Sequence, residues 1–414
     1  MDLSLPGPET HWIDPFKRPP SDQDHTPQKL HRTVWVEASA NTAGERLSHS
    51  DSMEGEEEAH QQEKPSKKEK KAKKREKRKS SEQSDGEVDT RKEKEKKKKK
   101  TKGKEKGKPT VSIAVAGSII DNAQSLELAT LLAGQIARAA TIFRIDEVVV
   151  FDNKSTSSYD AEITDFENED GNENGAQFLV KILRYLETPQ YLRKRLFPMH
   201  KNLKYVGLLP PLDAPHHYRK HEWSQFREGV TLDGDRSNGT PVDVGLMKNI
   251  LVEQILEPGK RVTVAMGTNR DLNPGVLRTI VPSSCPREEM GLYWGYRVRY
   301  AANLSSVFKN SCLKGGYDHV IGTSEHGQAI SSSELVLPCF RHLLIVFGGL
   351  SGLEESIEED NNLKGKGTNE VFMSYLNTCP HQGSRTIRTE EAILISLQYF
   401  QEPIKQAEAQ FLEK

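Results

Sequence analysis

The segment NTCPHQGSRTIRTEEAI, Asn377 to Ile393, joins a polar turn, a glycine-containing loop and the start of a helix. Pro380 and Gly383 bend the backbone of the loop, and Thr389 is expected to cap the helix that follows. The helix should bury one face, because three apolar side chains recur at the spacing i, i+4, i+7: Ile393, Leu397 and Phe400. The segment therefore predicts a polar binding loop anchored by a rigid helix.

Two apolar strands precede this segment, and each ends in small or polar residues. YDHVIG (317–322) leads into TSEHG, and LLIVFGG (343–349) leads into LSGLEE. In open α/β sheets ligands bind beyond the carboxyl ends of the strands, so the three loops are predicted to line one pocket. The chain contains neither GxGxxG nor GKS or GKT, which argues against a Rossmann dinucleotide site and a P-loop.

The region after residue 108 opens with a strand–helix–strand pattern. VSIAVA (111–116) is a short buried strand, Ser125 is expected to cap a helix, and EVVVFD (147–152) is the next strand. Such a unit predicts two parallel strands. Residues 109–211 and 303–414 are therefore assigned to one α/β domain, with further helices at 177–186 and 191–196.

Residues 212–302 have a different texture, with short β-rich runs separated by turns. Strands are expected at 262–266, 276–281 and 293–300, which favours a small barrel or sandwich inserted into the α/β domain. The last run is YWGYRVRY. Its aromatic and basic side chains would form a stacking and phosphate-binding surface for RNA if they were exposed, or an aromatic core if buried, and both alternatives stay open: Tyr293, Trp294, Tyr296, Arg297 and Arg299.

The histidine-rich segment HHYRKH (216–221) raises the question of a metal site. It lacks matched carboxylates or cysteines, so a polar connection that faces RNA is favoured and no bound metal is expected. The four cysteines form no CxxC pair and are too few for a disulfide framework, which favours a reducing compartment.

A Lys-rich segment occupies residues 61–108. It holds 23 Lys and Arg against 10 Asp and Glu, so its net charge is +13 and the rest of the chain carries −14. With almost no apolar residues, this segment is expected to be disordered, as are residues 1–60. The basic runs favour nuclear targeting and attraction to a polyanion over a merely solvated tail. No apolar run is long enough to span a membrane, and no signal peptide is expected.

Several pieces of residues 109–400, in order, resemble the SPOUT class of RNA methyltransferases, in the archaeal and eukaryotic branch with an inserted OB-like barrel. They are VAGSIIDNAQSLEL, QYLRKRLFP, GLLPPLDAPHH, GLYWGYRVR, IGTSEHG, VFGGLSGLEE and NTCPHQGSRTIRTEEAIL. The subgroup they resemble most methylates uridine N3 of 28S rRNA. The resemblance implies a C-terminal trefoil knot, S-adenosylmethionine as cofactor, an RNA substrate and a homodimer. The expected location is the nucleus or nucleolus, with the cytoplasm and mitotic spindle as further locations.

The resemblance also assigns roles to individual positions. His326 departs from the family pattern, in which an Arg stands, and a neutral His lacks the permanent charge of Arg. Arg385 is expected to place the target nucleotide, with a structural fork to Glu390 or Glu391 as the alternative. Glu325 is a candidate base, and Arg388 is a candidate RNA contact together with Arg297 and Arg299. The implied cofactor contacts are Thr323, His326, Gly327, Gly348, Gly349, Asn377, Thr378, Gly383 and Ile387.

Methyl transfer from a sulfonium needs an in-line nucleophile, and a uridine N3 target must also lose a proton. The sequence does not choose between Glu325, Glu390 and Glu391 as the base, or stabilisation of the deprotonated uracil by Arg385. Two other functions remain open. One is a noncatalytic scaffold bound to RNA or the spindle, and the other is ribose 2′-O methylation on the same fold.

Overall fold

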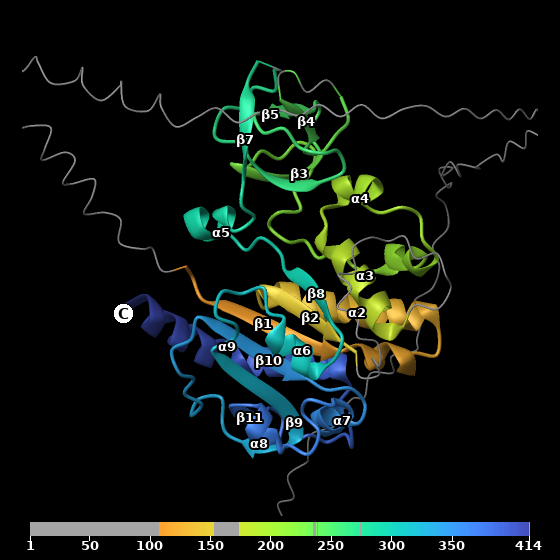
Figure 1. Ribbon diagram of the computed structural model, residues 1–414, viewed down its shortest axis with the longest axis vertical. Helices are drawn as coiled ribbons and strands as arrows, with labels where there is room; N and C mark the ends of the chain where they lie inside the picture. Colours follow the sequence, from red (N-terminus) through yellow and green to blue (C-terminus); the bar gives the residue numbers. More distant parts are fainter. Residues whose placement is uncertain (1–106, 153–173, 235–236, 238, 274, 414) are drawn as a thin grey trace, which may run out of the picture. The chain divides into compact units, whose positions relative to one another are not determined.

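The computed structural model describes residues 107–152, 174–234, 237, 239–273 and 275–413 (Figure 1). The prediction of disorder for residues 1–108 falls almost wholly outside this part of the chain. Within it, no helix is long and apolar enough to cross a membrane.

A parallel six-stranded sheet forms the centre of the described chain, in the order β11-β9-β10-β1-β2-β8. The pairing of β1 with β2, which aligns Ile113 with Val148, confirms the predicted strand–helix–strand unit. On its other side β1 pairs with β10, so the two halves of the α/β domain share one sheet. The strands are β1 (Thr110–Ala116), β2 (Glu147–Phe151), β8 (Arg297–Ala301), β9 (His319–Ala329), β10 (His342–Phe347) and β11 (Ser374–Asn377).

Helices cover both faces of this sheet, because alternate strand residues point to opposite sides. Ile113 and Ile345 pack in the core beneath one set of helices, and Ala114 and Val346 pack in the core beneath the other. The first set is α2 (Leu126–Ile142), α3 (Gly175–Glu187) and α9 (Thr389–Glu413). The second set includes α6 (Leu304–Lys309) and α7 (Gly352–Glu359) (Figure 1).

The helix ends follow local chemistry. Ser125 accepts a hydrogen bond from the backbone N–H of Leu128 at 3.2 Å, which confirms the predicted cap of α2. Asn174 and Gln177 form a capping box at the start of α3. The shorter helices are η1 (Gly117–Asn122), α4 (Gln190–Leu196), η2 (Lys201–Leu203), η3 (Val206–Leu208), α5 (Cys285–Met290) and α8 (Thr368–Val371).

The predicted inserted barrel is confirmed as a closed five-stranded barrel in the order β3-β4-β5-β7-β6. Parallel pairing of β5 with β7 completes the closure. Valines pointing inward, such as Val242 and Val264, fill the interior and are fully buried. The barrel strands are β3 (Phe226–Thr231), β4 (Thr240–Asp243), β5 (Ile250–Val252), β6 (Arg261–Ala265) and β7 (Leu277–Val281).

The aromatic run YWGYRVRY lies outside this barrel, contrary to the prediction. Its second half forms β8, which pairs with β2 in the main sheet. Its first three aromatic side chains are buried, and each donates a hydrogen bond to a distant element. Tyr293 bonds the carbonyl of Ile145, Trp294 bonds the carboxylate of Glu228, and Tyr296 bonds the carbonyl of Leu183. The stacking surface proposed for RNA is therefore wrong, and the aromatic residues pack instead.

Candidate functional site

The first of the three predicted loops is an excursion within β9. Tyr375 of β11 pairs with Gly322, but the next residue, Leu376, pairs with Gln328. Residues 323–327 therefore have no partner in β11, although Thr323 still pairs with Phe347 of β10, and the pairing with β11 resumes at Gln328, directly after Gly327. A side chain at Gly327 would place its Cβ 2.4 Å from the backbone carbon of Leu376, so only glycine fits at the return.

The second loop follows β10 and turns tightly into α7. Gly349 and Gly352 form an isolated bridge, and Gly352 has a φ of +82°, which favours glycine. A Cβ on Gly348 would lie 2.5 Å from the backbone carbon of Gly352, and one on Gly349 would lie 2.7 Å from the hydroxyl of Ser118. The loop therefore packs its backbone against itself and against the end of β1.

The third loop is tied to the other two by side-chain hydrogen bonds. The Asn377 amide donates to the carbonyl of Glu325 in the first loop at 2.9 Å. The hydroxyl of Thr389, at the start of α9, donates to the carbonyl of Gly348 at 3.1 Å. Thr389 thus links two loops, in addition to beginning the helix. The three loops meet at the carboxyl edge of the sheet, as the sequence predicts.

Glu354, in the first turn of α7, connects the first and second loops, and it was not among the residues predicted from the sequence. Its Oε1 lies 3.1 Å from Nδ1 of His326 and 3.4 Å from the hydroxyl of Ser324. Burial opposes its ionisation, but its own backbone N–H and the neighbouring side chains of Tyr375 and His326 outweigh this and lower its pKa. The carboxylate is therefore ionised beside His326. Its position two residues after GLSG, where a helix start favours an acidic residue, was the available signal.

The remaining third-loop residues lie near the mouth of this edge. Gly383 and Arg385 are exposed, and a Cβ on Gly383 would meet no atom within 4 Å. Within the described chain the Arg385 guanidinium has no ion-pair or hydrogen-bond partner, so the alternative of a fork to Glu390 or Glu391 does not apply to it. Arg388 takes that place at 3.7 Å from Glu390, with 78% of its side chain exposed. Ile387 is half-buried between these arginines, and the Thr378 hydroxyl bonds Ser396 at 2.7 Å.

Arg297 and Arg299, two further predicted RNA contacts, differ in their exposure to solvent. Arg299 is buried: its Nε bonds Glu147 at 3.2 Å and one Nη bonds the carbonyl of Val307 at 2.9 Å. The prediction that Arg299 meets RNA is therefore wrong, because Glu147 of the neighbouring strand neutralises it inside the domain. Arg297, two residues earlier on β8, is exposed and stays a prediction.

The chemistry of this edge fits the cofactor that the sequence resemblance implies. Glycines at 327, 348 and 349 let the loops pack closely against neighbouring parts of the chain, which brings main-chain groups of the loops together at this edge. The carboxylates of Glu325 and Glu354 lie at this edge, and such groups suit a ligand with a positive sulfonium and a positive amino group. His326 lies between them with 72% of its side chain exposed.

The histidines of HHYRKH serve a structural purpose elsewhere. Nε2 of His216 lies 3.0 Å from the carbonyl of Glu187, and Nε2 of His217 lies 2.7 Å from the same oxygen. Burial, and the neighbouring His216, lower the pKa of His217 to about 3, so it is neutral at physiological pH. Across the described ranges, no three His, Cys, Asp or Glu side chains cluster as metal ligands.

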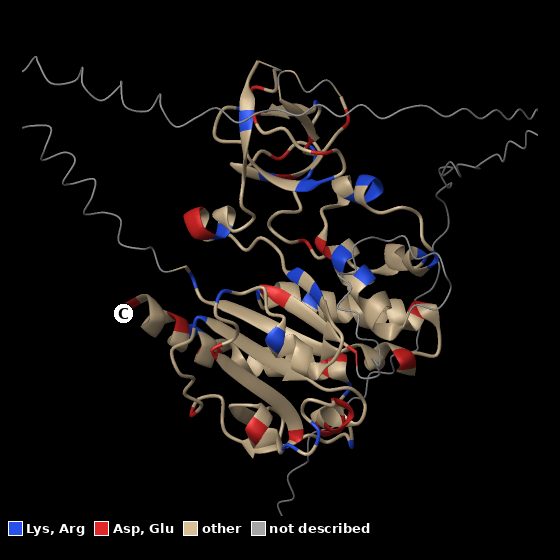
Figure 2. Cartoon of the chain, viewed as in Figure 1, with Lys and Arg blue, Asp and Glu red and all other residues tan. Residues whose placement is uncertain are grey.

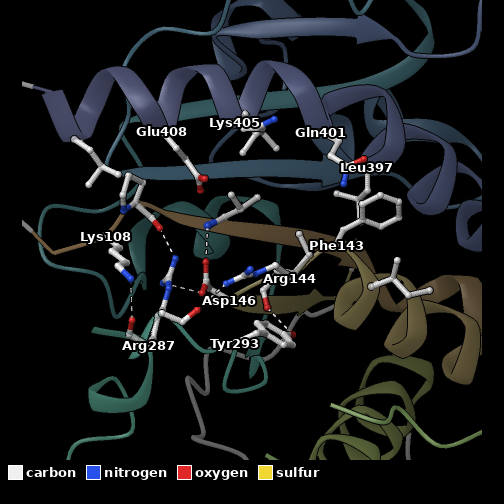
Figure 3. Close-up of a pocket in the computed structure, with 17 residues that line it drawn as sticks. Lys108, Phe143, Arg144, Asp146, Arg287, Tyr293, Leu397, Gln401, Lys405 and Glu408 are labelled. Atoms are coloured by element: carbon white, nitrogen blue, oxygen red, sulfur yellow. Dashed lines mark hydrogen bonds and ion pairs between the residues drawn. The ribbon is translucent and has the colours of Figure 1, made fainter. Parts of the chain in front are cut away.

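A cavity of about 380 Å³ lies at the opposite, amino edge of the sheet, away from the three loops. Figure 3 shows Asp146 and Arg287 facing each other there, with Glu408 of α9 pointing into the space. Asp146 pairs with Arg287 at 2.8 Å and accepts the backbone N–H of Val111 at 2.9 Å. This cavity joins α5 and α9 to the start of β1 and β2, and it has no part in the edge described above.

Comparison with known proteins shows which proteins this chain resembles in sequence. A family model described as putative RNA methyltransferase matches residues 110–400. A 28S rRNA (uridine-N(3))-methyltransferase of Mus musculus is 48% identical over 300 residues, covering 72% of this chain and 77% of that protein. The Homo sapiens protein of the same name is 49% identical over 305 residues, covering 72% and 80%. A putative methyltransferase of Caenorhabditis elegans is 37% identical over 301 residues, covering 69% and 78%.

Proposed function

Because the chain belongs to the putative RNA methyltransferase family, we propose that it transfers a methyl group from S-adenosylmethionine to N3 of a uridine in large-subunit ribosomal RNA. One observation carries the proposal. Three loops at the carboxyl edge of the sheet are interlocked through Asn377, Thr389 and Glu354, as a single ligand pocket requires.

The first two loops are proposed to hold the cofactor's methionine and ribose parts. Thr323 leads into the first loop and donates its hydroxyl to the carbonyl of Val346 at 2.9 Å, which fixes where that loop leaves the sheet. Gly348 and Gly349 let the second loop turn tightly, so that its main-chain groups lie at this edge. The adenine is proposed to bond backbone groups of the third loop near Thr378 and Ile387. The bound cofactor supplies an electrophilic methyl group.

The protein's remaining task is to position the uracil and remove its N3 proton. Positioning supplies much of the rate of such a reaction, because the nucleophile must approach in line. Arg385, exposed and unpaired within the described chain, is proposed to hold the target nucleotide and to stabilise the negative charge that develops as the proton leaves. Glu325, beside His326 at the mouth, is the proposed proton acceptor.

Three finer features complete the proposal. The C-terminal segment is proposed to thread as a trefoil knot, supported by the bond from Thr389 to Gly348 between the second loop and the start of α9. A homodimer is proposed, supported by exposed apolar residues on α2 and α9, among them Leu128 and Leu394, and sedimentation would detect it.

The basic tail supports a place in the nucleus or nucleolus, with the spindle as a second location, and imaging of a tagged chain tests both.

The role of Arg385 can be tested by mutation. Arg385→Ala is expected to lower methylation of ribosomal RNA by a factor of 100 or more, on the order of what losing one charge-stabilising contact costs. Binding of S-adenosylmethionine, measured by calorimetry, should not change. Arg341→Ala removes an exposed Arg at the amino end of β10 and serves as control. Full turnover of the Arg385 variant would remove this residue from the mechanism.

A further inference from the structure

Residues 190–221, here called the basic connection, join α3 to the first barrel strand and concentrate positive charge. Seven of these 32 residues are Lys or Arg, and Asp213 is the one acidic residue. Residues 109–414 as a whole contain 31 Lys and Arg against 38 Asp and Glu. The connection is therefore strongly basic within an acidic body, and Figure 2 marks its basic helix α4 in blue.

The start of the connection is held rigidly. Leu192 of α4 is fully buried, and the Tyr191 hydroxyl donates to the carbonyl of Glu228 in the barrel at 2.9 Å. Arg193 donates to the carbonyls of Thr188 at 2.8 Å and Leu186 at 2.9 Å, which ties α4 to the end of α3. Arg193 thus serves structure, and its neighbours on α4 are displayed in a fixed place.

A buried charge network fixes the same region to the barrel. Arg261 of β6 pairs with Glu187 at 2.5 Å and with Glu228 at 2.8 Å, and both carboxylates are more than nine-tenths buried. Burial opposes ionisation of Glu187, but the charge of Arg261 and a bond from His216 hold its pKa well below its usual range. Both ends of the basic connection are therefore held by the same buried, ionised network of Arg261, Glu187 and Glu228.

Four lysines of the connection are left for an outside partner. Within the described part of the chain none has a carboxylate partner, and all four are exposed: Lys194, Lys201, Lys204 and Lys220. Arg195 pairs with Asp243 at 2.7 Å but keeps 49% of its side chain exposed. These charges are not neutralised from within, so a negatively charged partner gains their full attraction.

We propose that the basic connection binds the phosphate backbone of the substrate RNA, an inference that rests on the proposed function in naming RNA. Lysines act as point charges toward phosphate and release counterions when they bind it. Protein interfaces, in contrast, are depleted in Lys at their centres and enriched in aromatic residues. Unpaired lysines on a rigid support therefore favour RNA over an acidic protein.

The position of the basic connection sets what it contributes. A Cβ on Gly117, at the carboxyl end of β1, would meet Ala176 in the first turn of α3. The 13 residues of α3 then run away from that edge for about 20 Å before α4 begins. The connection therefore holds a part of the RNA remote from the reacting nucleotide. It should set RNA affinity and leave the chemical step unchanged.

The test is a variant of the full chain in which Lys194, Lys201, Lys204 and Lys220 are all changed to Gln. A matched control changes four other exposed lysines to Gln: Lys248, Lys309, Lys314 and Lys364. Both variants remove the same charge. Ribosomal RNA containing 4-thiouridine is crosslinked to each protein by ultraviolet light, and the attached chymotryptic peptides are identified by mass spectrometry, which separates the Lys-rich tail from the folded body.

We expect wild-type crosslinks in 190–221 that fall at least about ten-fold in the first variant and persist in the control, together with a weaker salt dependence of RNA binding. Equal losses in both variants, or no crosslinks in 190–221, would overturn the proposal. The proposal would also be overturned if the first variant bound RNA as well as the wild type does but no longer bound an acidic protein. Crosslinking needs no turnover, so a chain that binds RNA here without methylating it would contradict the proposed function alone.

Discussion

At the scale of single residues, the glycines of the candidate pocket divide into two kinds. A Cβ at Gly348 would collide with the backbone of Gly352 at 2.5 Å, whereas a Cβ at Gly383 would meet open space. Both residues are candidates for cofactor contact, so the pair makes a matched comparison. Backbone cannot yield to a new methyl group as a flexible side chain can.

Gly348→Ala is therefore expected to shift the second loop and weaken S-adenosylmethionine binding at least about ten-fold, a cost of 1.4 kcal/mol or more. Gly383→Ala should leave binding within about two-fold. Isothermal calorimetry on both variants measures the difference. Equal affinities would show that the second loop tolerates displacement and that its backbone does not contact the cofactor.

Asp146 is a buried residue whose charge changes with pH below neutrality. Burial raises its pKa to about 6, against the opposing charge of Arg287. A carboxyl group that binds its proton more tightly when folded stabilises the protein at low pH, and this contribution is lost as pH rises from about 4 to 6.

We expect the unfolding free energy of the wild type to fall relative to Asp146→Asn between pH 4 and pH 7, by up to about 3 kcal/mol. Guanidinium unfolding of both proteins at each pH measures the change. Glu408→Gln is a useful companion, because burial also raises the pKa of Glu408. A difference between wild type and Asp146→Asn that stays constant with pH would contradict the account.

Individual site residues were predictable only where their signal is local. Asn377, Gly348 and Thr323 follow apolar strands, and the sequence places all three at one edge. Glu354 escaped notice because its partners, Ser324 and His326, lie about thirty residues earlier and reach it only in the folded sheet. Arg299 was wrongly predicted to be exposed for the same reason, because the carboxylate that pairs with it belongs to Glu147, which is distant in the sequence.

At the scale of elements, the barrel depends on charge as well as on its core. Its interior is small, and Arg261 binds its first strand to the end of α3 through two buried carboxylates. Breaking such a pair by removing one partner leaves the other charge buried and uncompensated.

Arg261→Met should therefore lower the unfolding free energy by about 3–5 kcal/mol, because Glu187 and Glu228 lose their cation. Arg195→Met removes a half-exposed pair with Asp243 and should cost about 0–1 kcal/mol. Guanidinium unfolding followed by circular dichroism compares the two. Similar losses would mean that solvent reaches the Glu187 network more freely than its burial indicates.

Elements were predicted best where periodicity and end signals agree. The cap at Ser125 and the apolar stripe that follows it predicted α2 correctly, and apolar runs predicted the parallel strands correctly. The run YWGYRVRY misled because its aromatic and basic residues suit a barrel strand as well as a strand of a parallel sheet. Pairing with β2, nearly 150 residues earlier, decides between these, and no local pattern contains that partner.

At the scale of the whole molecule, the chain combines a cofactor edge, an inserted barrel and a basic connection between them. The sequence predicted the first two from strand patterns and family resemblance. The connection escaped as a unit because its charges are spread over 190–221 and some, such as Arg193, are committed to internal bonds. Only the contacts seen in the folded structure distinguish the Lys and Arg side chains with a structural role from those that are free to bind RNA.

The most direct measurement combines the purified full chain with S-adenosylmethionine labelled in its methyl group and unmodified large-subunit ribosomal RNA. Nucleosides released by digestion are then identified by mass spectrometry. We predict labelled N3-methyluridine at a single position, reduced in Gly348→Ala when the cofactor is limiting and retained in Gly383→Ala. Label on a ribose 2′-oxygen, or no label in any nucleoside, would contradict the account.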